Sequence, residues 1–224
     1  MHQKVRITKR QLKEDKFTTF MLTSKDRLQE SWQFVVIGVV AVILAVVAVV
    51  YYLDARESAA EEAGSKFAQA LMDYRSGNNQ VAVLSFAQLV EDYSDQPAAE
   101  YSTYLLGISN YRQRNYDEAI RYYQEYLSRF KGDLLMRAGA MAGMAACFED
   151  QGRLPEAMEK YEQAISEYPS GPQIGDYHLG AMRCAAGAGN TEKAREHLAF
   201  IQQEYKGTQL VESATRLAAE GGIY

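Results

Sequence analysis

The sequence contains very little of the chemistry that most catalytic and metal sites use. Its 224 residues include only three histidines and two cysteines, and His2, His178 and His197 stand far apart along the chain. No HExxH or GxSxG motif, no paired His/Cys spacing and no phosphate-binding glycine loop occurs. The sequence therefore predicts a protein that is not an enzyme and that carries no metal or other cofactor.

A surplus of basic residues is also absent from most of the chain. The whole chain has a net charge of −5, and its first 33 residues carry +4, from eight Lys/Arg and four acidic residues, which leaves −9 on the remainder. Nucleic-acid binding requires a basic footprint. The charge therefore argues against a nucleic-acid partner and predicts an acidic soluble body that suits positively charged or neutral partners.

Charge is missing altogether from one long stretch. Residues 34–53 are twenty consecutive residues without a charged side chain, and the uncharged window widens to residues 31–53. A helix rises ~1.5 Å per residue, so twenty residues match the ~30 Å hydrocarbon core of a bilayer. The sequence therefore predicts one transmembrane helix over residues 31–53.

The charges on both flanks predict the orientation of this span. Basic residues precede it and acidic residues dominate directly after it, and basic flanks stay in the cytoplasm. We expect a protein of the bacterial inner membrane with a cytoplasmic N-terminus and a periplasmic C-terminal domain. The alternative is a cleaved signal peptide, which has an apolar stretch of ~7–15 residues and a small residue at the cleavage site. Tyr51, Tyr52 and Leu53 occupy that place here, which favours a retained anchor.

Two features in and before the span point to membrane contacts. Small residues recur along one side of the predicted helix at Gly38, Ala41, Ala45 and Ala48, a pattern that lets a second membrane helix approach. Because alanine is common in spans, the alternative is that this side has no dedicated contact. The basic leader, residues 1–30, has apolar residues at helical spacing and predicts an amphipathic helix on the inner leaflet, or a segment that docks to a cytoplasmic partner.

The part of the chain after the span contains an internal repeat. Four segments align on alanines that are 37, 38 and 37 residues apart. The aligned residues are Ala82, Ala119, Ala157 and Ala194. Each copy has the pattern of a helix, a tight turn and a second helix, and three of the turns carry a glycine, namely Gly77, Gly152 and Gly189. Strand signals are absent, so this part is predicted to be all-α.

The third copy carries the most specific pattern. Ala145 holds the small position of the first helix, Gly152 the turn, Ala157 and Tyr161 the second helix, and Pro169 follows it. Through these residues the sequence resembles the tetratricopeptide repeat family, with a period longer than the family's usual ~34 residues. Together with the span predicted from the apolar run, the resemblance implies an all-α protein with a single transmembrane helix followed by an α-solenoid of about four helix pairs, and a capping helix near residues 208–217.

The predicted organisation follows from the span and the repeats. Residues 1–30 form the cytoplasmic leader, 31–53 the transmembrane helix, 54–62 a juxtamembrane linker and 63–224 the periplasmic repeat domain. Cys147 and Cys184 fall at the same position of repeats three and four. Stacked repeats place such positions roughly 10 Å apart, beyond the Cα separation of ~4.4–6.8 Å that a disulfide needs. We therefore expect two buried free thiols.

Tyrosine is unusually frequent, with 16 copies, seven of them between Tyr101 and Tyr126. In the family that the sequence resembles, set positions of each first helix line the concave face. Mapped onto this chain, the predicted protein-binding residues are Phe67, Leu71, Tyr74 and Arg75 in repeat one and Tyr101, Tyr104, Ile108, Tyr111 and Arg112 in repeat two. Aromatic and Arg side chains are typical anchors of protein interfaces. The alternative is that neighbouring helices bury these tyrosines.

Repeats three and four place small residues on the same face, among them Gly139, Ala142, Ala146 and Gly187. We therefore expect the groove to be shallow there.

The order of leader, span and repeats is similar to that of the ancillary subunit of the bacterial Sec translocon, which the leader segment at residues 9–17 also resembles. This resemblance implies a membrane-anchored scaffold that assists newly exported proteins. The repeats are also similar to those of a cell-division coordinator and of outer-membrane assembly lipoproteins. They imply the alternative, a structural or organising subunit of a cell-wall, cell-division or outer-membrane assembly complex.

Overall fold

The computed structural model describes the backbone of residues 9–223 and the side chains of residues 32–223. Residues 9–223 contain nine α-helices and no strand, which confirms the predicted all-α fold. The chain divides into two compact units, Met1–Glu57 and Ser58–Tyr224.

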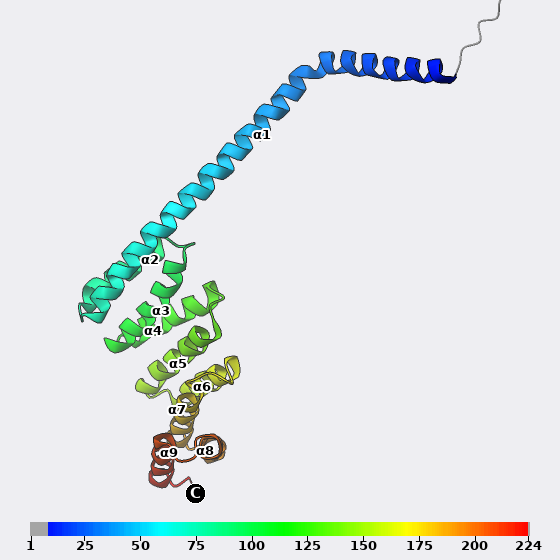
Figure 1. Ribbon diagram of the computed structural model, residues 1–224. Helices are drawn as coiled ribbons and strands as arrows, with labels where there is room; N and C mark the ends of the chain where they lie inside the picture. The colour runs from blue at the N-terminus through cyan, green and yellow to red at the C-terminus, as the bar shows by residue number, and fades with distance from the viewer. Residues whose placement is uncertain (1–8, 224) are drawn as a thin grey trace, which may run out of the picture. The chain divides into compact units, whose positions relative to one another are not determined.

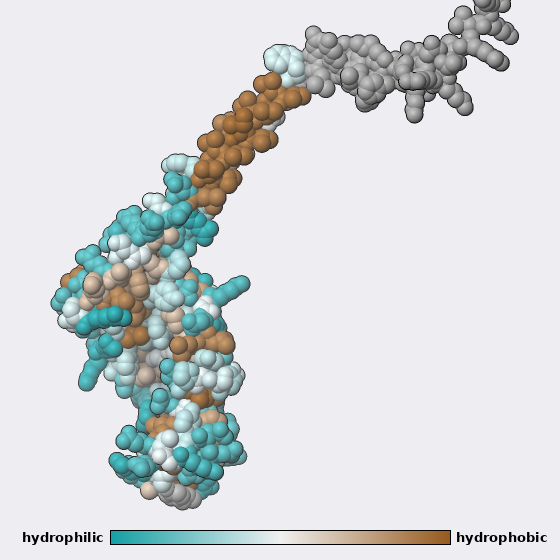
Figure 2. Space-filling view, in the orientation of Figure 1, coloured by the Kyte–Doolittle hydropathy of each residue, from teal (hydrophilic) through white to brown (hydrophobic). Residues whose placement is uncertain are grey.

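The first unit is dominated by α1 (Lys9–Arg75), a helix of 67 residues that continues into the second unit. Its part Trp32–Arg75 contains an 18-residue window with a mean hydropathy of 3.2, none of which is buried. Phe34 and Leu44 are 75% and 63% exposed, and Figure 2 shows the continuous hydrophobic surface of this stretch. The helix is therefore long and apolar enough to cross a membrane.

One predicted segment lies wholly on α1, and the described part of another, residues 9–30, lies on it as well. Residues 54–62, predicted as a linker, continue the helix without a break. The amphipathic character predicted for residues 1–30 concerns side chains that lie outside the described residues.

The second unit is a solenoid of helix pairs. The C-terminal end of α1 packs against α2 (Asn79–Asp92) and forms repeat one. The later pairs are α3 (Pro97–Arg112) with α4 (Tyr116–Arg129), α5 (Leu134–Asp150) with α6 (Leu154–Glu167), and α7 (Ile174–Gly187) with α8 (Thr191–Glu204). The final helix, α9 (Gln209–Glu220), packs on α7 and α8 as a cap. Figure 1 shows these helices stacked in chain order, and they confirm the predicted solenoid of four pairs and a cap.

The turn inside every repeat has the same geometry. Gly77, Gly152 and Gly189 have φ angles of 87°, 75° and 77°, and in repeat two Arg114 takes the equivalent place with a φ of 62°. In each turn this residue's N–H bonds to the carbonyl three residues back, and the next N–H bonds to the carbonyl five residues back. This pattern is the Schellman motif, which ends a helix through one left-handed residue. The sharp reversal lets the second helix pack back on the first.

The repeats are held together by alanines and tyrosines. The four aligned alanines have no exposed surface, as expected where two helix backbones approach closely. Tyr123 of α4 lies between two glycines: a Cβ added to Gly107 or Gly143 would lie 2.6 or 2.5 Å from its ring. The tyrosine therefore fills the space between α3 and α5. Cys147 and Cys184 are buried and free, as predicted.

Candidate functional site

The first helices of the repeats form one layer of the second unit. Among the described residues α3 contacts α5 and α5 contacts α7, whereas α4 makes no contact with α6. Helices that touch directly lie on the tighter side of a curved stack, so the exposed side of α3, α5 and α7 is the inner face of the solenoid. All nine predicted protein-binding residues lie on this layer or on the end of α1 that precedes it.

The predicted residues of repeat one are partly packed. Phe67, Leu71 and Tyr74 are half-buried, while Arg75 is exposed. The rings of Phe67 and Tyr74 lie 5.9 and 6.2 Å from that of Phe86, measured between centroids. These two aromatic side chains therefore contribute to the core of repeat one and offer only one edge to a partner.

The residues of repeat two divide in the same way. Tyr101 is 47% exposed and Arg112 is exposed, whereas Tyr104, Ile108 and Tyr111 are half-buried. Tyr104 packs between two core tyrosines of α4, with centroids 6.0 and 5.5 Å away. Burial and a hydrogen bond to the Asp150 carboxylate raise the pKa of Tyr111 to about 12, so its hydroxyl stays neutral.

The two sets meet across the boundary between repeats. The Phe67 and Tyr101 rings are 6.0 Å apart, and the Arg112 guanidinium lies 5.0 Å from the centre of the Tyr74 ring. Residues of α1 and α3 thus form one continuous aromatic and cationic surface. We call the surface formed by Phe67, Tyr74, Tyr101 and Arg112 the aromatic strip.

A hollow of about 380 Å³ opens on the inner face beside the aromatic strip. Its lining residues are Tyr104, Leu135, Met136, Gly139, Ala142, Gln173 and Tyr177. The small residues that led us to expect a shallow surface instead leave a cavity, because large side chains stand on both sides of them. Leu135, Met136, Gln173 and Tyr177 were missed, since the prediction considered each repeat separately. The aligned repeats already showed the change from large to small residues, but not which side chains of neighbouring repeats border the gap.

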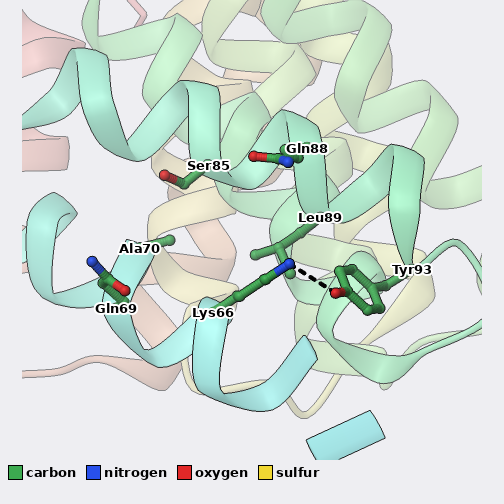
Figure 3. A pocket seen from close by; sticks show the side chains of 7 residues that line it. All are labelled: Lys66, Gln69, Ala70, Ser85, Gln88, Leu89 and Tyr93. Atoms are coloured by element: carbon green, nitrogen blue, oxygen red, sulfur yellow. Dashed lines mark hydrogen bonds between the residues drawn. The ribbon is translucent and has the colours of Figure 1, made fainter. Parts of the chain in front are cut away.

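A second cavity, of about 250 Å³, lies between α1 and α2 (Figure 3). Lys66 crosses it and donates a hydrogen bond to the Tyr93 hydroxyl at 2.9 Å, and its ammonium also pairs with Glu62 at 3.0 Å. Gln69, Ser85 and Gln88 supply the other polar groups. The one cation in this cavity is therefore already paired, and nothing here selects a charged ligand.

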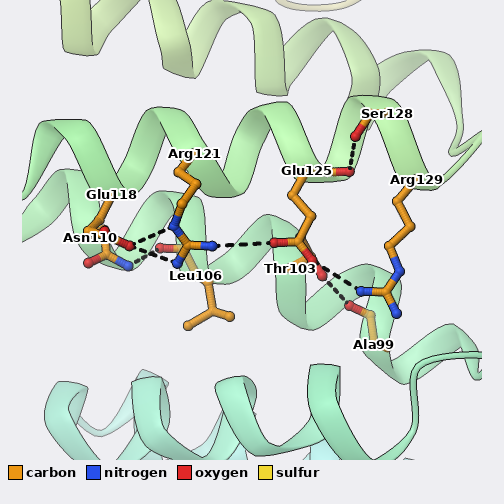
Figure 4. A network of polar contacts seen from close by, with 9 residues as sticks. All are labelled: Ala99, Thr103, Leu106, Asn110, Glu118, Arg121, Glu125, Ser128 and Arg129. Carbon is orange, nitrogen blue, oxygen red and sulfur yellow. Dashed lines mark hydrogen bonds and ion pairs between the residues drawn. The ribbon is translucent and has the colours of Figure 1, made fainter.

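The outer side of α4 has a different character (Figure 4). Arg121 lies between Glu118 and Glu125, and Arg129 pairs with Glu125 at 3.1 Å. In α3, Thr103 and Asn110 donate to carbonyls one turn back in their own helix. The exposed ion pairs of Arg121 and Arg129 contribute little to stability. The ion pairs of this surface lie within α4, and the Arg121 guanidinium also lies 4.0 Å from the centre of the half-buried Tyr122 ring.

The predicted contact stripe of the span lies exposed on α1. Gly38, Ala41, Ala45 and Ala48 are all exposed, and a Cβ added to Gly38 would meet no atom within 4 Å. The stripe therefore has room for another helix, and its role in a membrane contact stays a prediction.

Two of the scattered histidines come together in repeat four. His178 of α7 and His197 of α8 are buried, with their Nδ1 atoms 3.0 Å apart. One Nδ1–H must donate to the other Nδ1, so the two rings share one proton at this contact. The Nε2 of His197 is 3.6 Å from Glu162, which favours His197 as the acceptor at Nδ1. Among the described residues, no group of three or more His, Cys, Asp and Glu side chains could hold a metal ion.

The repeats are similar to known repeat proteins. Residues 66–134 and 104–172 match the tetratricopeptide repeat family model. The chain is similar to solved TPR-like repeats of a putative kinesin light chain from Podosopora anserina, with a TM-score of 0.56 and 15% identity over 70% of this chain and 83% of that one. It is also similar to residues 41 to the end of MamA from Desulfovibrio magneticus RS-1, with a TM-score of 0.54 and 15% identity over 65% of this chain and 78% of that one. No curated protein matches the sequence.

Proposed function

We propose that this chain, which carries tetratricopeptide repeats over residues 66–172, is a membrane-anchored protein-binding scaffold of the bacterial envelope. In this proposal α1 crosses the inner membrane once, its N-terminus is cytoplasmic and the repeats are periplasmic. The scaffold assists newly exported proteins near the Sec translocon by binding them on its inner face.

The observation that carries the proposal is the composition of the inner face. It combines an exposed Tyr101, an exposed Arg112 and an apolar hollow on adjacent first helices. Protein interfaces concentrate their binding energy in aromatic and Arg side chains next to such apolar pockets. The outer side of α4 differs from this face, because its exposed Arg side chains pair with Glu118 and Glu125 of the same helix.

The membrane part of the proposal rests on α1. Its apolar stretch exposes large side chains around the whole helix, and no residue of its most apolar window is buried. Exposure of apolar surface to water costs ~25 cal/mol of free energy per Å², whereas exposure to lipid does not carry this cost. The basic residues ahead of the stretch support a cytoplasmic N-terminus.

Site-specific photo-crosslinking in native membranes tests the proposal. A photoreactive side chain is placed at Tyr101 on the inner face, and a control one at Gln124, which is exposed on α4. We expect many exported proteins to crosslink at Tyr101, each at low occupancy, and few at Gln124. The same few envelope proteins in constant ratio would instead support the organising subunit. Equal crosslinking at both positions would contradict an inner-face site.

Removal of the exposed anchors provides the second test. The double variant Tyr101→Ser, Arg112→Ser should fold as the wild type does, because substitutions of exposed residues usually change the free energy of unfolding by less than ~0.5 kcal/mol each. Crosslinking to exported proteins, reported from a third position on the inner face such as Leu71, should fall strongly. The variant Gln124→Ser is the matched control and should crosslink normally.

A further inference from the structure

The hollow on the inner face occupies a gap in the repeat pattern. Ala142 of α5 is equivalent to Tyr104 in repeat two and Leu179 in repeat four. One turn earlier, Gly139 is equivalent to Tyr101 and Asp176. The flanking repeats thus place large side chains where repeat three has a methyl group and a hydrogen atom. The hollow therefore lies where the neighbouring repeats place large side chains of their own.

Aromatic and aliphatic side chains enclose this space. Tyr104 reaches across α5, since a Cβ added to Gly139 would lie 2.5 Å from its hydroxyl oxygen. Tyr177 lines the hollow from α7, and Leu135 and Met136 line it from the start of α5. No lining residue carries a charge. A volume of about 380 Å³ lies within the range of ~300–1,000 Å³ that is typical of ligand pockets.

The rim of the hollow is acidic. Asp133 caps α5, where its carboxylate accepts the Met136 N–H at 2.7 Å, and Asp176 lies in the first turn of α7. Both carboxylates are exposed. Each lies close enough to a tyrosine of the hollow to affect its pKa. Burial, and next Asp133, raise the pKa of Tyr104, and burial, Tyr104 and Asp176 raise the pKa of Tyr177. Arg137, which follows Met136, pairs with Glu167, so its charge is balanced, whereas Lys131 is an exposed cation two residues before Asp133.

We infer that the hollow is the anchor subsite of the proposed scaffold and takes one bulky apolar side chain, of the size of Phe, Tyr or Leu, from a protein segment with Lys or Arg beside it. The inference rests on the proposed function and specifies what the bound segment contains. The apolar side chain supplies the buried area, and the acidic rim selects basic over acidic neighbours.

Methyl NMR on the full-length protein in lipid nanodiscs tests this inference. Methionine methyl groups are labelled, so that Met136 reports on the hollow and Met72, which is 73% exposed on α1, serves as the reference. The probes are three capped tripeptides, Lys-Phe-Lys, Lys-Ala-Lys and Glu-Phe-Glu. Each is titrated at low salt and the Kd is read from the Met136 shift.

We expect Lys-Phe-Lys to shift Met136 saturably and to bind at least about tenfold more tightly than Lys-Ala-Lys, the ratio expected for burial of one large apolar side chain. Glu-Phe-Glu should bind more weakly than Lys-Phe-Lys, and added salt should reduce that difference. Equal affinities for the Phe and Ala peptides would overturn the inference. So would the absence of a Met136 shift at the solubility limit, or a Met136 shift that depends on protein concentration without peptide, which would indicate that a second copy covers the hollow.

Two variants distinguish the hollow from the rest of the face. Ala142→Leu places in repeat three the side chain that repeat four already has, and should abolish the Met136 response while the protein stays folded. Ala146→Leu, one turn along the same helix at a half-buried site outside the lining, should leave the response intact. If Ala142→Leu has no effect on peptide binding or on crosslinking to exported proteins, while Tyr101→Ser, Arg112→Ser abolishes that crosslinking, the subsite is wrong and the scaffold function stands. If neither variant reduces crosslinking, both the subsite and the proposed scaffold function are wrong.

Discussion

The four turns within the repeats share one backbone conformation but not one residue type. Three use glycine, whereas Arg114 adopts a positive φ with a side chain attached. A left-handed conformation costs an L-residue roughly 1–2 kcal/mol, and glycine avoids this cost while losing part of the gain through the greater freedom of the unfolded chain. The turn of repeat two is therefore a local weak point.

Arg114→Gly should raise the free energy of unfolding by about 0.5–1 kcal/mol, the difference between these two effects. The reciprocal variant is Gly152→Ala, where an added Cβ meets no atom within 4 Å, so that any change comes from the backbone alone. It should lower the free energy by about the same amount. Urea unfolding of a soluble fragment starting at Ser58 measures both. A loss of stability in Arg114→Gly would contradict the explanation.

At this scale the sequence predicts some side chains well and others poorly. The buried alanines could be predicted because each sits at a fixed place in a repeated pattern, where two backbones must approach. The exposure of Tyr104 and Tyr111 could not, because it depends on how α4 and α5 pack beside α3. Their half-buried positions follow from contacts with residues that lie in other helices.

Some helix boundaries could be predicted from the sequence and one could not. The paired helices of the repeats end at turns that the sequence marks, and their positions were predictable. Residues 54–62 were predicted as a linker because they follow the span and are polar, yet they are rich in Ala and Glu and contain no Pro or Gly. These residues favour a helix, and nothing in the segment stops α1.

The α7–α8 pair should respond to pH through its buried histidines. Burial, and next the proximity of His197, lower the pKa of His178 to about 4, and burial also lowers that of His197, although Glu162 and Glu196 oppose the shift. Both rings are then neutral in the folded protein near pH 7. The unfolded chain, with ordinary His pKa values near ~6.5, binds more protons as the pH falls below that value. Stability should therefore be complete above about pH 6.5 and decrease as the pH falls toward about 4.

Thermal unfolding between pH 7.5 and pH 4.5 checks this expectation. The double variant His178→Leu, His197→Leu removes both titrating rings and should lose less stability than the wild type over the same interval. Carboxylates titrate in both proteins, so the difference between their losses of stability reports the contribution of the two histidines. Identical pH profiles would show that the buried pair does not contribute.

At the scale of the whole chain, the sequence predicted what is either local or periodic. The apolar stretch of α1 is a local feature, namely a run of consecutive apolar residues. The solenoid is a periodic feature, with a repeat of 37 or 38 residues. The hollow is neither, because its walls come from three helices in three successive repeats. Only their packing shows that a small residue leaves a cavity instead of a flat surface.

The orientation across the membrane is the last prediction and the one on which the proposed compartment depends. Eight Lys/Arg precede the apolar stretch, and each is expensive to move through a bilayer and is retained on the cytoplasmic side. In spheroplasts carrying the chain with a tag at each end, external protease should remove the C-terminal tag and digest the repeats, while the N-terminal tag survives on a short fragment. A cytoplasmic protein that stays intact confirms that the cells are sealed, and lysis before digestion should remove both tags. Survival of the C-terminal tag in sealed cells would place the inner face in the cytoplasm, where it would never meet exported proteins, and would falsify the proposed scaffold together with its location.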